Sequence, residues 1–384
     1  MSETLYCDHA ATAPIRPEVT AAIAPWLSRL VGNPAAMHPL GEESSSVLEQ
    51  ARGMIANVLG TESACHPEDV LLTSGGTEAN NLAVKGLALA NPRGKHIVTS
   101  AFEHPAIHEP LQQLKTWHGF EIDYAPITPD GVVDLEAFKG LLREDTTLAT
   151  VMTVNNEIGT IQPIAELAAA AHEVGALFHT DAVQAAGCLP LAPIWAAVDA
   201  MSLTGHKIGA QVGVGALIVK AALPLEAQQV GGGQQWARRA GTQNLVGAVG
   251  LATALLYAQE EAQDAELKQA MKERMNRVVR ELKAVFPGME HTGADAPHLP
   301  TTLALRFPWV YGETVLVDLA QRGVYVATGS ACHAGQTDPS HVLLALGLDD
   351  EEAKTGLRIS VGLDFSDADA DRLIQALIDV VPQP

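Results

Sequence analysis

Short apolar segments alternate with helix-like segments over more than a hundred residues of this chain, and this alternation limits the possible folds most. Segments typical of buried strands cover residues 70–73, 96–100, 120–125, 148–154 and 176–180, with helix-forming segments between them. Strands that are joined by helices pair in parallel, and the helices then cover both faces of the sheet. The sequence therefore predicts an α/β domain with a mostly parallel sheet.

A second, smaller domain is expected after residue 245. The pattern changes beyond Lys220, where a polar loop over 231–242 precedes a long helical stretch over 245–285 and three further strands among helices. A chain of 384 residues also exceeds the size that one core usually serves. We expect a large domain over residues 16–245, and a small α+β domain formed by residues 1–15 and 246–384.

Charge and cysteine content exclude several kinds of protein. The net charge of −21, from 45 acidic and 24 basic residues, argues against a nucleic-acid surface, which needs a basic face. No apolar run reaches the roughly 18 residues of a membrane helix. The cysteines are far apart and form no CxxC pair, so neither a metal site nor a disulfide framework is expected, and a reducing cytoplasm fits best. They are Cys7, Cys65, Cys188 and Cys332.

Polar side chains follow the ends of several expected strands, where ligands bind in parallel α/β sheets. They are Thr77, His104, Asn156, Asp181, Gln184 and Lys207. Lys207 stands between small residues after a strand, so it is a candidate Schiff-base nucleophile, because desolvation would lower the pKa of its amine. A surface lysine in a turn is the alternative. The glycine-rich turn at 74–81 opens a helix and could bind a phosphate, although a plain helix N-cap would look the same.

Pyridoxal 5'-phosphate requires a lysine for its aldehyde, a carboxylate for its pyridine nitrogen, a group that stacks on its ring, and a phosphate site. Lys207, Asp181 and His104 would fill the first three roles. Thr77, Thr204 and His206 would bind the phosphate. Singly, Asp181 could be a helix N-cap and His104 a half-buried histidine, so the assignment depends on the group as a whole.

Nine motifs extend this pattern over almost the whole chain. They lie at 6–14 (YCDHAATAP), 32–38 (GNPAAMH), 73–81 (TSGGTEANN), 103–105 (EHP), 155–162 (NNEIGTIQ), 179–185 (HTDAVQA), 205–207 (GHK), 231–244 (GGGQ and RAGTQN) and 328–332 (TGSAC). With them the chain resembles the cysteine desulfurases, pyridoxal-phosphate enzymes of the class V aminotransferase group. The resemblance implies the fold type I architecture, with a seven-stranded sheet in the large domain and a smaller C-terminal domain.

The resemblance also implies roles for the cofactor-binding residues. Lys207 would bond to the cofactor, His104 would stack on its ring, and Asp181 would hold its pyridine nitrogen. Gln184 and Asn156 would reach the ring hydroxyl. Phosphate contacts would come from Gly76, Thr77, Thr204 and His206, and from Thr242 of a second subunit, which implies a homodimer.

The resemblance implies three residues for binding the substrate and one for accepting its sulfur. Asn33, Asn156 and Arg358 would bind L-cysteine, and the guanidinium fork of Arg358 suits the α-carboxylate. Cys332 would attack the substrate sulfur as a thiolate, leaving a persulfide on Cys332 and releasing alanine. The persulfide would then pass to an acceptor protein, in iron–sulfur cluster assembly or in thio-cofactor or tRNA modification.

Two alternatives remain open at this point. The same scaffold could serve a selenocysteine lyase, an aminotransferase or an epimerase, and turnover would then survive the loss of Cys332. A non-catalytic binding subunit is the other alternative. Residues 235–237 (QWA) replace the family's usual Glu-x-Gly, and Leu363 stands where an arginine is usual. These departures concern the range of partners and substrates more than the core chemistry.

Overall fold

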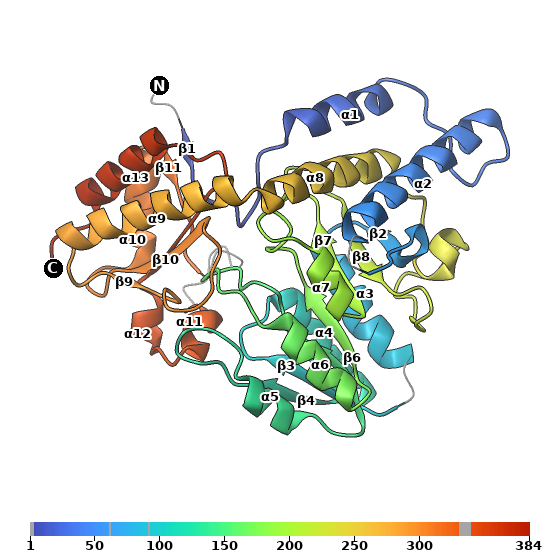
Figure 1. Cartoon of the computed structure of the whole chain (residues 1–384), viewed down its shortest axis with the longest axis horizontal. Coiled ribbons are helices and arrows are strands. Elements are labelled where there is room, and N and C mark those ends of the chain that lie inside the picture. The colour runs from blue at the N-terminus through green and yellow to red at the C-terminus, as the bar shows by residue number, and fades with distance from the viewer. Residues whose placement is uncertain (1–3, 61–62, 91–92, 330–338) are drawn as a thin grey trace.

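The structure is a computed structural model that describes residues 4–60, 63–90, 93–329 and 339–384. It has two parts, a larger one built on a seven-stranded sheet and a smaller one built on a three-stranded sheet (Figure 1). Helix α8 (Leu245–Gln263) lies in the larger part, and α9 (Ala265–Val285) continues from it into the smaller one.

The large sheet confirms the predicted α/β class. Its strand order is β2-β8-β7-β6-β5-β3-β4. Neighbours from β4 to β7 are parallel, whereas β8 is antiparallel to both β7 and β2. The strands are β2 (Val70–Thr73), β3 (His96–Ser100), β4 (Glu121–Ala125), β5 (Thr146–Thr150), β6 (Leu177–Asp181), β7 (Ala200–Thr204) and β8 (Gly215–Val219). The strand expected over 148–154 therefore begins and ends earlier than predicted.

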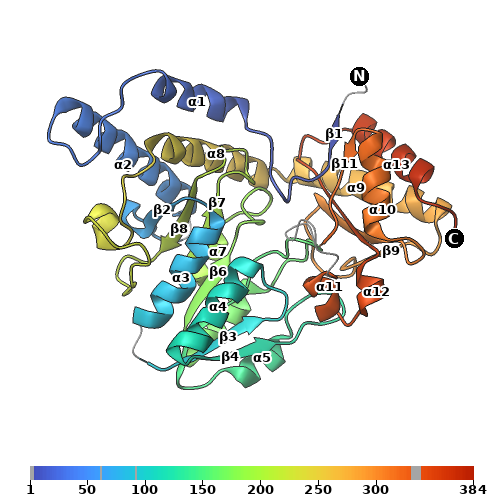
Figure 2. The ribbon, with the colours of Figure 1, turned by 180° about the vertical axis from the view of Figure 1, so that it is seen from behind.

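Helices cover both faces of this sheet, because successive strand residues point to opposite sides. Leu71 and Ile97 pack with α3 (Gly76–Ala90) and α4 (Pro105–His118). Leu72 and Val98, one residue further along each strand, belong to the core on the other face. That core includes residues of α2 (Pro39–Leu59), α5 (Leu135–Leu141), α6 (Ile164–Glu173) and α7 (Ala192–Ala197). Figure 2 shows α3 and α4 on the side opposite α5 and α6.

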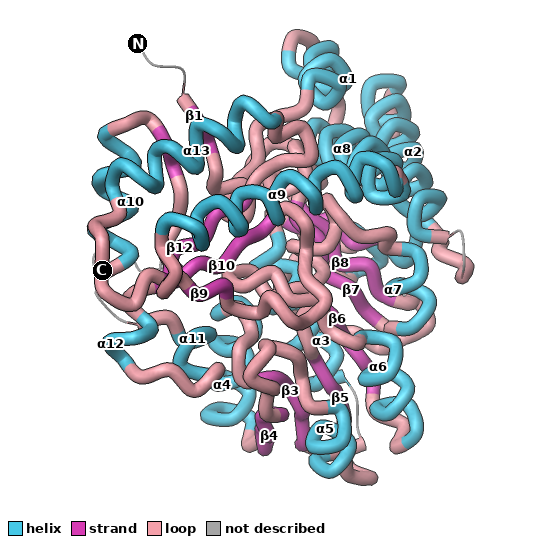
Figure 3. The backbone as a smooth tube through the Cα atoms, turned by 60° about the vertical axis from the view of Figure 1, so that its left-hand side comes forward, coloured by secondary structure: helices cyan, strands magenta, loops and turns pink. Residues whose placement is uncertain are grey.

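The smaller part has its own core. Its sheet, in the order β12-β10-β9, is antiparallel, and residues of α9 and α13 contribute to the same core (Figure 3). Strand β1 (Leu5–Tyr6) pairs with β11 (Val324–Tyr325), so the N-terminal segment lies beside this part. The remaining elements are α1 (Pro17–Leu27), β9 (Glu290–His291), β10 (Thr302–Arg306), α10 (Gly312–Gln321), α11 (His341–Ala345), α12 (Asp350–Ala353), β12 (Gly356–Ser360) and α13 (Asp367–Val380).

Helix α8 packs in the larger part, although the expected domain boundary between residues 245 and 246 would assign it to the smaller one. Leu251 and Leu255 of α8 belong to the core of the larger part, together with Ile55 of α2. Helix α8 is apolar over most of its sides and is buried, whereas α9 is amphipathic and covers the small sheet with one face. Residues of α8 belong to the core of the larger part and residues of α9 to the core of the smaller part. Asp264 ends α8 and caps α9, so we place the division between the two parts there.

No helix within the described residues is long and apolar enough to cross a membrane.

Candidate active site

A cavity of about 280 Å³ opens at the carboxyl ends of the parallel strands. Ten residues expected from the sequence line it: Gly76, Thr77, His104, Asn156, Asp181, Gln184, Thr204, His206, Lys207 and Arg358. Several elements contribute to the lining, since Asp181 ends β6, Thr204 ends β7, Gly76 begins α3 and Arg358 lies in β12. The site thus lies where the large sheet meets the smaller part of the molecule.

Asp181 is buried and held by two donors. Its Oδ2 accepts a hydrogen bond from Asn80 Nδ2 at 2.6 Å, and its Oδ1 accepts one from the Val183 backbone N at 2.9 Å. The carboxylate therefore has a fixed orientation at the wall of the cavity. The role of Asn80 is not predicted from the sequence. The available signal was its place on α3, one helical turn after Gly76 and Thr77.

His104 is both the N-cap of α4 and a wall of the cavity. Its Nδ1 accepts a hydrogen bond from the Ala106 backbone N at 3.0 Å, so the neutral imidazole carries its proton on Nε2. Burial lowers the pKa of His104, and the nearby Lys207 lowers it further, whereas Asp181 opposes this shift. The ring is thus oriented by the helix terminus and kept neutral by its surroundings.

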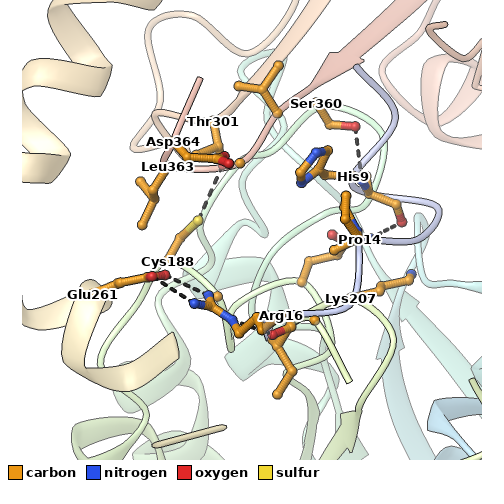
Figure 4. Close-up of a pocket in the computed structure, with 18 of the residues that line it drawn as sticks. His9, Pro14, Arg16, Cys188, Lys207, Glu261, Thr301, Ser360, Leu363 and Asp364 are labelled. Carbon is orange, nitrogen blue, oxygen red and sulfur yellow. Dashed lines mark hydrogen bonds and ion pairs between the residues drawn. The ribbon is translucent and has the colours of Figure 1, made fainter. Parts of the chain in front are cut away.

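Lys207 follows β7 in a tight turn. A side chain on Gly205 would come within 2.9 Å of Ala210 Cβ and Val214 Cγ1, and Gly209 has a φ of +87°, which favours glycine. Lys207 lines the cavity of about 280 Å³ and also a second one of about 460 Å³ between the two parts of the molecule. Figure 4 shows Lys207 at the edge of this second cavity, across from Cys188.

Arg358 enters the cavity from the smaller part with its guanidinium already oriented. Its Nη2 lies 2.7 Å from Asp8 Oδ1, and its Nη1 donates to the Asn156 carbonyl oxygen at 3.0 Å. Only 6% of Arg358 is exposed. Asp8 lies within the N-terminal motif at 6–14, but the sequence alone does not reveal that it orients Arg358.

Three side-chain oxygens at the cavity have no hydrogen-bond partner among the described residues. Asn80 Oδ1, Asn156 Oδ1 and Thr204 Oγ1 are all buried, and buried polar atoms are normally paired with protein, water or a ligand. They lie around the same space as a lysine, a fixed carboxylate and a neutral imidazole. These are the groups that pyridoxal phosphate needs, so the residues present fit the cofactor.

Two expected site residues do not line this cavity, and a third lies outside the described residues. Asn33 lies in the loop before α2, where its Oδ1 accepts a hydrogen bond from the Ala35 backbone N at 2.9 Å. Thr242 is exposed. Cys332 lies outside the described residues, but Gly329, shortly before it, lines the cavity beside Arg358.

Comparison with known families covers nearly the whole chain. The family model of class-V aminotransferases matches residues 5–373. The chain belongs to this family. Among its relatives, the cysteine desulfurase IscS of Dictyoglomus turgidum is 38% identical over 382 residues, which span 99% of this chain and 95% of that protein. A cysteine desulfurase IscS from Methanosarcina thermophila is 36% identical over 99% of this chain and 92% of its own length.

Solved structures agree with this family assignment. A NifS-like protein superimposes with a TM-score of 0.90 at 31% identity, covering 98% of this chain and 99% of its own. SspA in complex with cysteine has a TM-score of 0.79 at 32% identity, covering 93% of this chain and 99% of its own. This class-V family member is therefore a pyridoxal-phosphate enzyme of the cysteine desulfurase group, as the sequence motifs predict.

Proposed function

We propose that this enzyme removes the sulfur of L-cysteine, releases L-alanine and leaves the sulfur as a persulfide on Cys332. The observation that carries the proposal is the convergence of Lys207, Asp181 and Arg358 on one cavity, with Gly329 at its edge. The near full-length similarity to cysteine desulfurases, and to a structure that contains cysteine, supports the same substrate.

Bound pyridoxal phosphate would withdraw electrons from the substrate and so weaken its Cβ–S bond. Asp181, held by Asn80 and Val183, would keep the cofactor's pyridine nitrogen protonated. Lys207 would hold the cofactor and exchange protons with the substrate carbon atoms. His104 would stack on the ring in its neutral form, because burial lowers its pKa.

Arg358 would bind the substrate α-carboxylate. Asp8 and the Asn156 carbonyl already hold two of its nitrogens, so little side-chain freedom is lost when the substrate binds. Asn156 Oδ1 and Thr204 Oγ1 would find partners on the bound cofactor, since each is buried without one in the described structure. Asn33 stays a proposed substrate-binding residue, with no contact in this cavity.

The sulfur-transfer step involves two sulfur groups, the thiol of Cys332 and the thiol of the substrate. The thiolate of Cys332 forms an S–S bond with the substrate sulfur while the substrate Cβ–S bond breaks. The electron pair of that bond stays on Cβ, which takes up a proton and becomes the methyl group of alanine. The products are L-alanine and the Cys332 persulfide, and no external oxidant is consumed.

We further propose a cytoplasmic homodimer that passes the persulfide to an acceptor protein. Thr242 lies away from the cavity of its own subunit and is exposed, which suits a contribution to the phosphate site of the partner subunit. The described cysteines Cys7, Cys65 and Cys188 are free, as expected in a reducing compartment. The similarity to two proteins named cysteine desulfurase IscS supports the persulfide that would be passed on.

The test compares wild type with Cys332→Ala in L-cysteine and a reductant, following alanine, sulfide and the visible cofactor spectrum. We expect both proteins to show the cofactor band and only wild type to release sulfur. Cys65→Ala is the matched control and should behave as wild type. Equal turnover by Cys332→Ala would leave the cofactor assignment intact but would refute the desulfurase function in favour of a lyase or aminotransferase.

A further inference from the structure

The buried carboxyl group of Glu157 lies where the two described ends of the Cys332 segment meet. Glu157 Oε2 accepts a hydrogen bond from the hydroxyl of Ser340, which follows the segment. Gly329, which precedes it, packs against the same group, because a Cβ on Gly329 would overlap Glu157 Oε2 and lie 2.9 Å from Ser340 Cβ. One carboxyl group therefore contacts the chain on both sides of Cys332.

Glu157 is itself held firmly. Asn155 Oδ1 accepts hydrogen bonds from the backbone N atoms of Glu157 at 2.9 Å and Ile158 at 3.1 Å. The Asn155 side chain in turn donates to the Phe102 carbonyl oxygen at 3.1 Å. Glu157 is only 5% exposed, and burial raises the pKa of its carboxyl group to about 7. Burying a carboxyl group costs desolvation free energy, so an apolar side chain would fill this space more favourably if Glu157 served packing alone.

The same contacts connect Glu157 to the substrate side of the active site. Gly329 lines the cavity that contains Lys207 and Arg358. A small space of about 20 Å³ is lined by Glu157, Gly329 and Arg358 together. Gly329, the last described residue before Cys332, thus lies beside the arginine that we assign to the substrate carboxylate.

We propose that Glu157 is a positioning residue that fixes Gly329 and Ser340, the described residues on either side of Cys332, and so sets the approach of the thiol to the substrate sulfur. The inference rests on the proposed function of Cys332. Glu157 acts through Gly329 and Ser340, not on the substrate itself. Attack on sulfur depends strongly on alignment, and a misplacement of about 1 Å can cost about 100-fold in rate.

The first test is Glu157→Ala in the cofactor-loaded enzyme. We expect kcat for sulfide release to fall at least about 10-fold, with the cofactor spectrum and the KM for L-cysteine unchanged, because alignment and not binding is lost. Glu157→Gln keeps an oxygen acceptor for Ser340 and should stay within about threefold of wild type. Glu136→Ala, which removes an exposed carboxylate paired with Lys139, is the control.

A second readout needs no cofactor. The alkylation rate of Cys332 by iodoacetamide, followed by mass spectrometry in cofactor-free protein, should change at least about threefold in Glu157→Ala and not in Glu136→Ala. If Glu157→Ala does not fold, Ser340→Ala removes the same hydrogen bond and should show the same loss of kcat.

A double-mutant cycle tests the contact with Gly329 directly. Gly329→Ala should lower kcat strongly in wild type and less in the Glu157→Ala background, because the overlap with Oε2 is then absent. The positioning role would be refuted if the two substitutions changed kcat independently. It would also be refuted if Glu157→Ala kept the kcat of wild type while Cys332→Ala was inactive; the proposed function would stand in both cases. Sulfide release by Cys332→Ala would refute the proposed function, and this role with it.

Discussion

Gln235 closes the free edge of the large sheet, and its replacement should destabilise the protein measurably. Strand β2 is the outermost strand on that side. Gln235 Oε1 accepts a hydrogen bond from the Leu72 backbone N at 2.7 Å, and Gln235 Nε2 donates to the Leu72 carbonyl oxygen at 2.9 Å. The amide thus substitutes for a neighbouring strand. The same Oε1 accepts a third hydrogen bond, from Arg52 Nη2 at 3.0 Å.

The cost of Gln235→Ala follows from these three bonds. Gln235 is 5% exposed and Arg52 is 2% exposed, so the groups left behind are buried. Each lost bond to Leu72 should cost about 1 kcal/mol, and the bond from the charged guanidinium about 1.5–3 kcal/mol. The free energy of unfolding should therefore fall by about 3.5–5 kcal/mol. Water that hydrogen-bonds to the opened edge would make this loss smaller.

This change can be measured by urea unfolding of the cofactor-free protein, monitored by far-UV circular dichroism. All variants are compared at the same protein concentration. Gln228→Ala is the control, since it removes one exposed hydrogen bond to the Glu226 carbonyl oxygen, and it should change stability by less than about 0.5 kcal/mol. Gln235→Glu keeps both acceptor bonds and loses the donated one, so its stability should be intermediate. A loss below about 1 kcal/mol for Gln235→Ala would refute the edge-closing role.

Three other predictions test separate features. Ala237 has a φ of +61°, so Ala237→Gly should raise the free energy of unfolding by about 0.5–1 kcal/mol in the same urea assay. Asp8→Asn weakens the hold on Arg358 and should raise the KM for L-cysteine about 10-fold with a smaller change in kcat, in steady-state assays. Burial lowers the pKa of His179 to about 4, so its stabilising contribution is complete above about pH 6.5 and is lost as the pH falls toward 4. In urea titrations, wild type should thus lose about 2–3 kcal/mol more than His179→Gln between pH 7 and pH 4.5.

Much of the fold and the centre of the site could be predicted from the sequence, because both depend on local order along the chain. The strand over 96–100 and the helix after Asp134 follow from apolar runs and a capping residue, and the structure has both at those places. The positions of the polar residues after strand ends predict that they gather around Lys207, because parallel strands bring their carboxyl ends to the same edge of the sheet. The structure places all six of these residues around one cavity, together with four others expected at the site.

Tertiary structure alone decided which side chains support that group. Asn80 reaches Asp181 across 101 residues, Ser340 reaches Glu157 across 183, and Arg358 reaches Asp8 across 350. No periodicity or local motif specifies such pairs, because each forms only when separate elements pack. The same holds for α8, whose apolar sequence requires burial but does not say against which part. The antiparallel direction of β8 is a further case, since a buried strand has the same apolar pattern in either direction. The residue types and their order thus determined the chemistry, whereas the packing of distant segments determined how it is held in place.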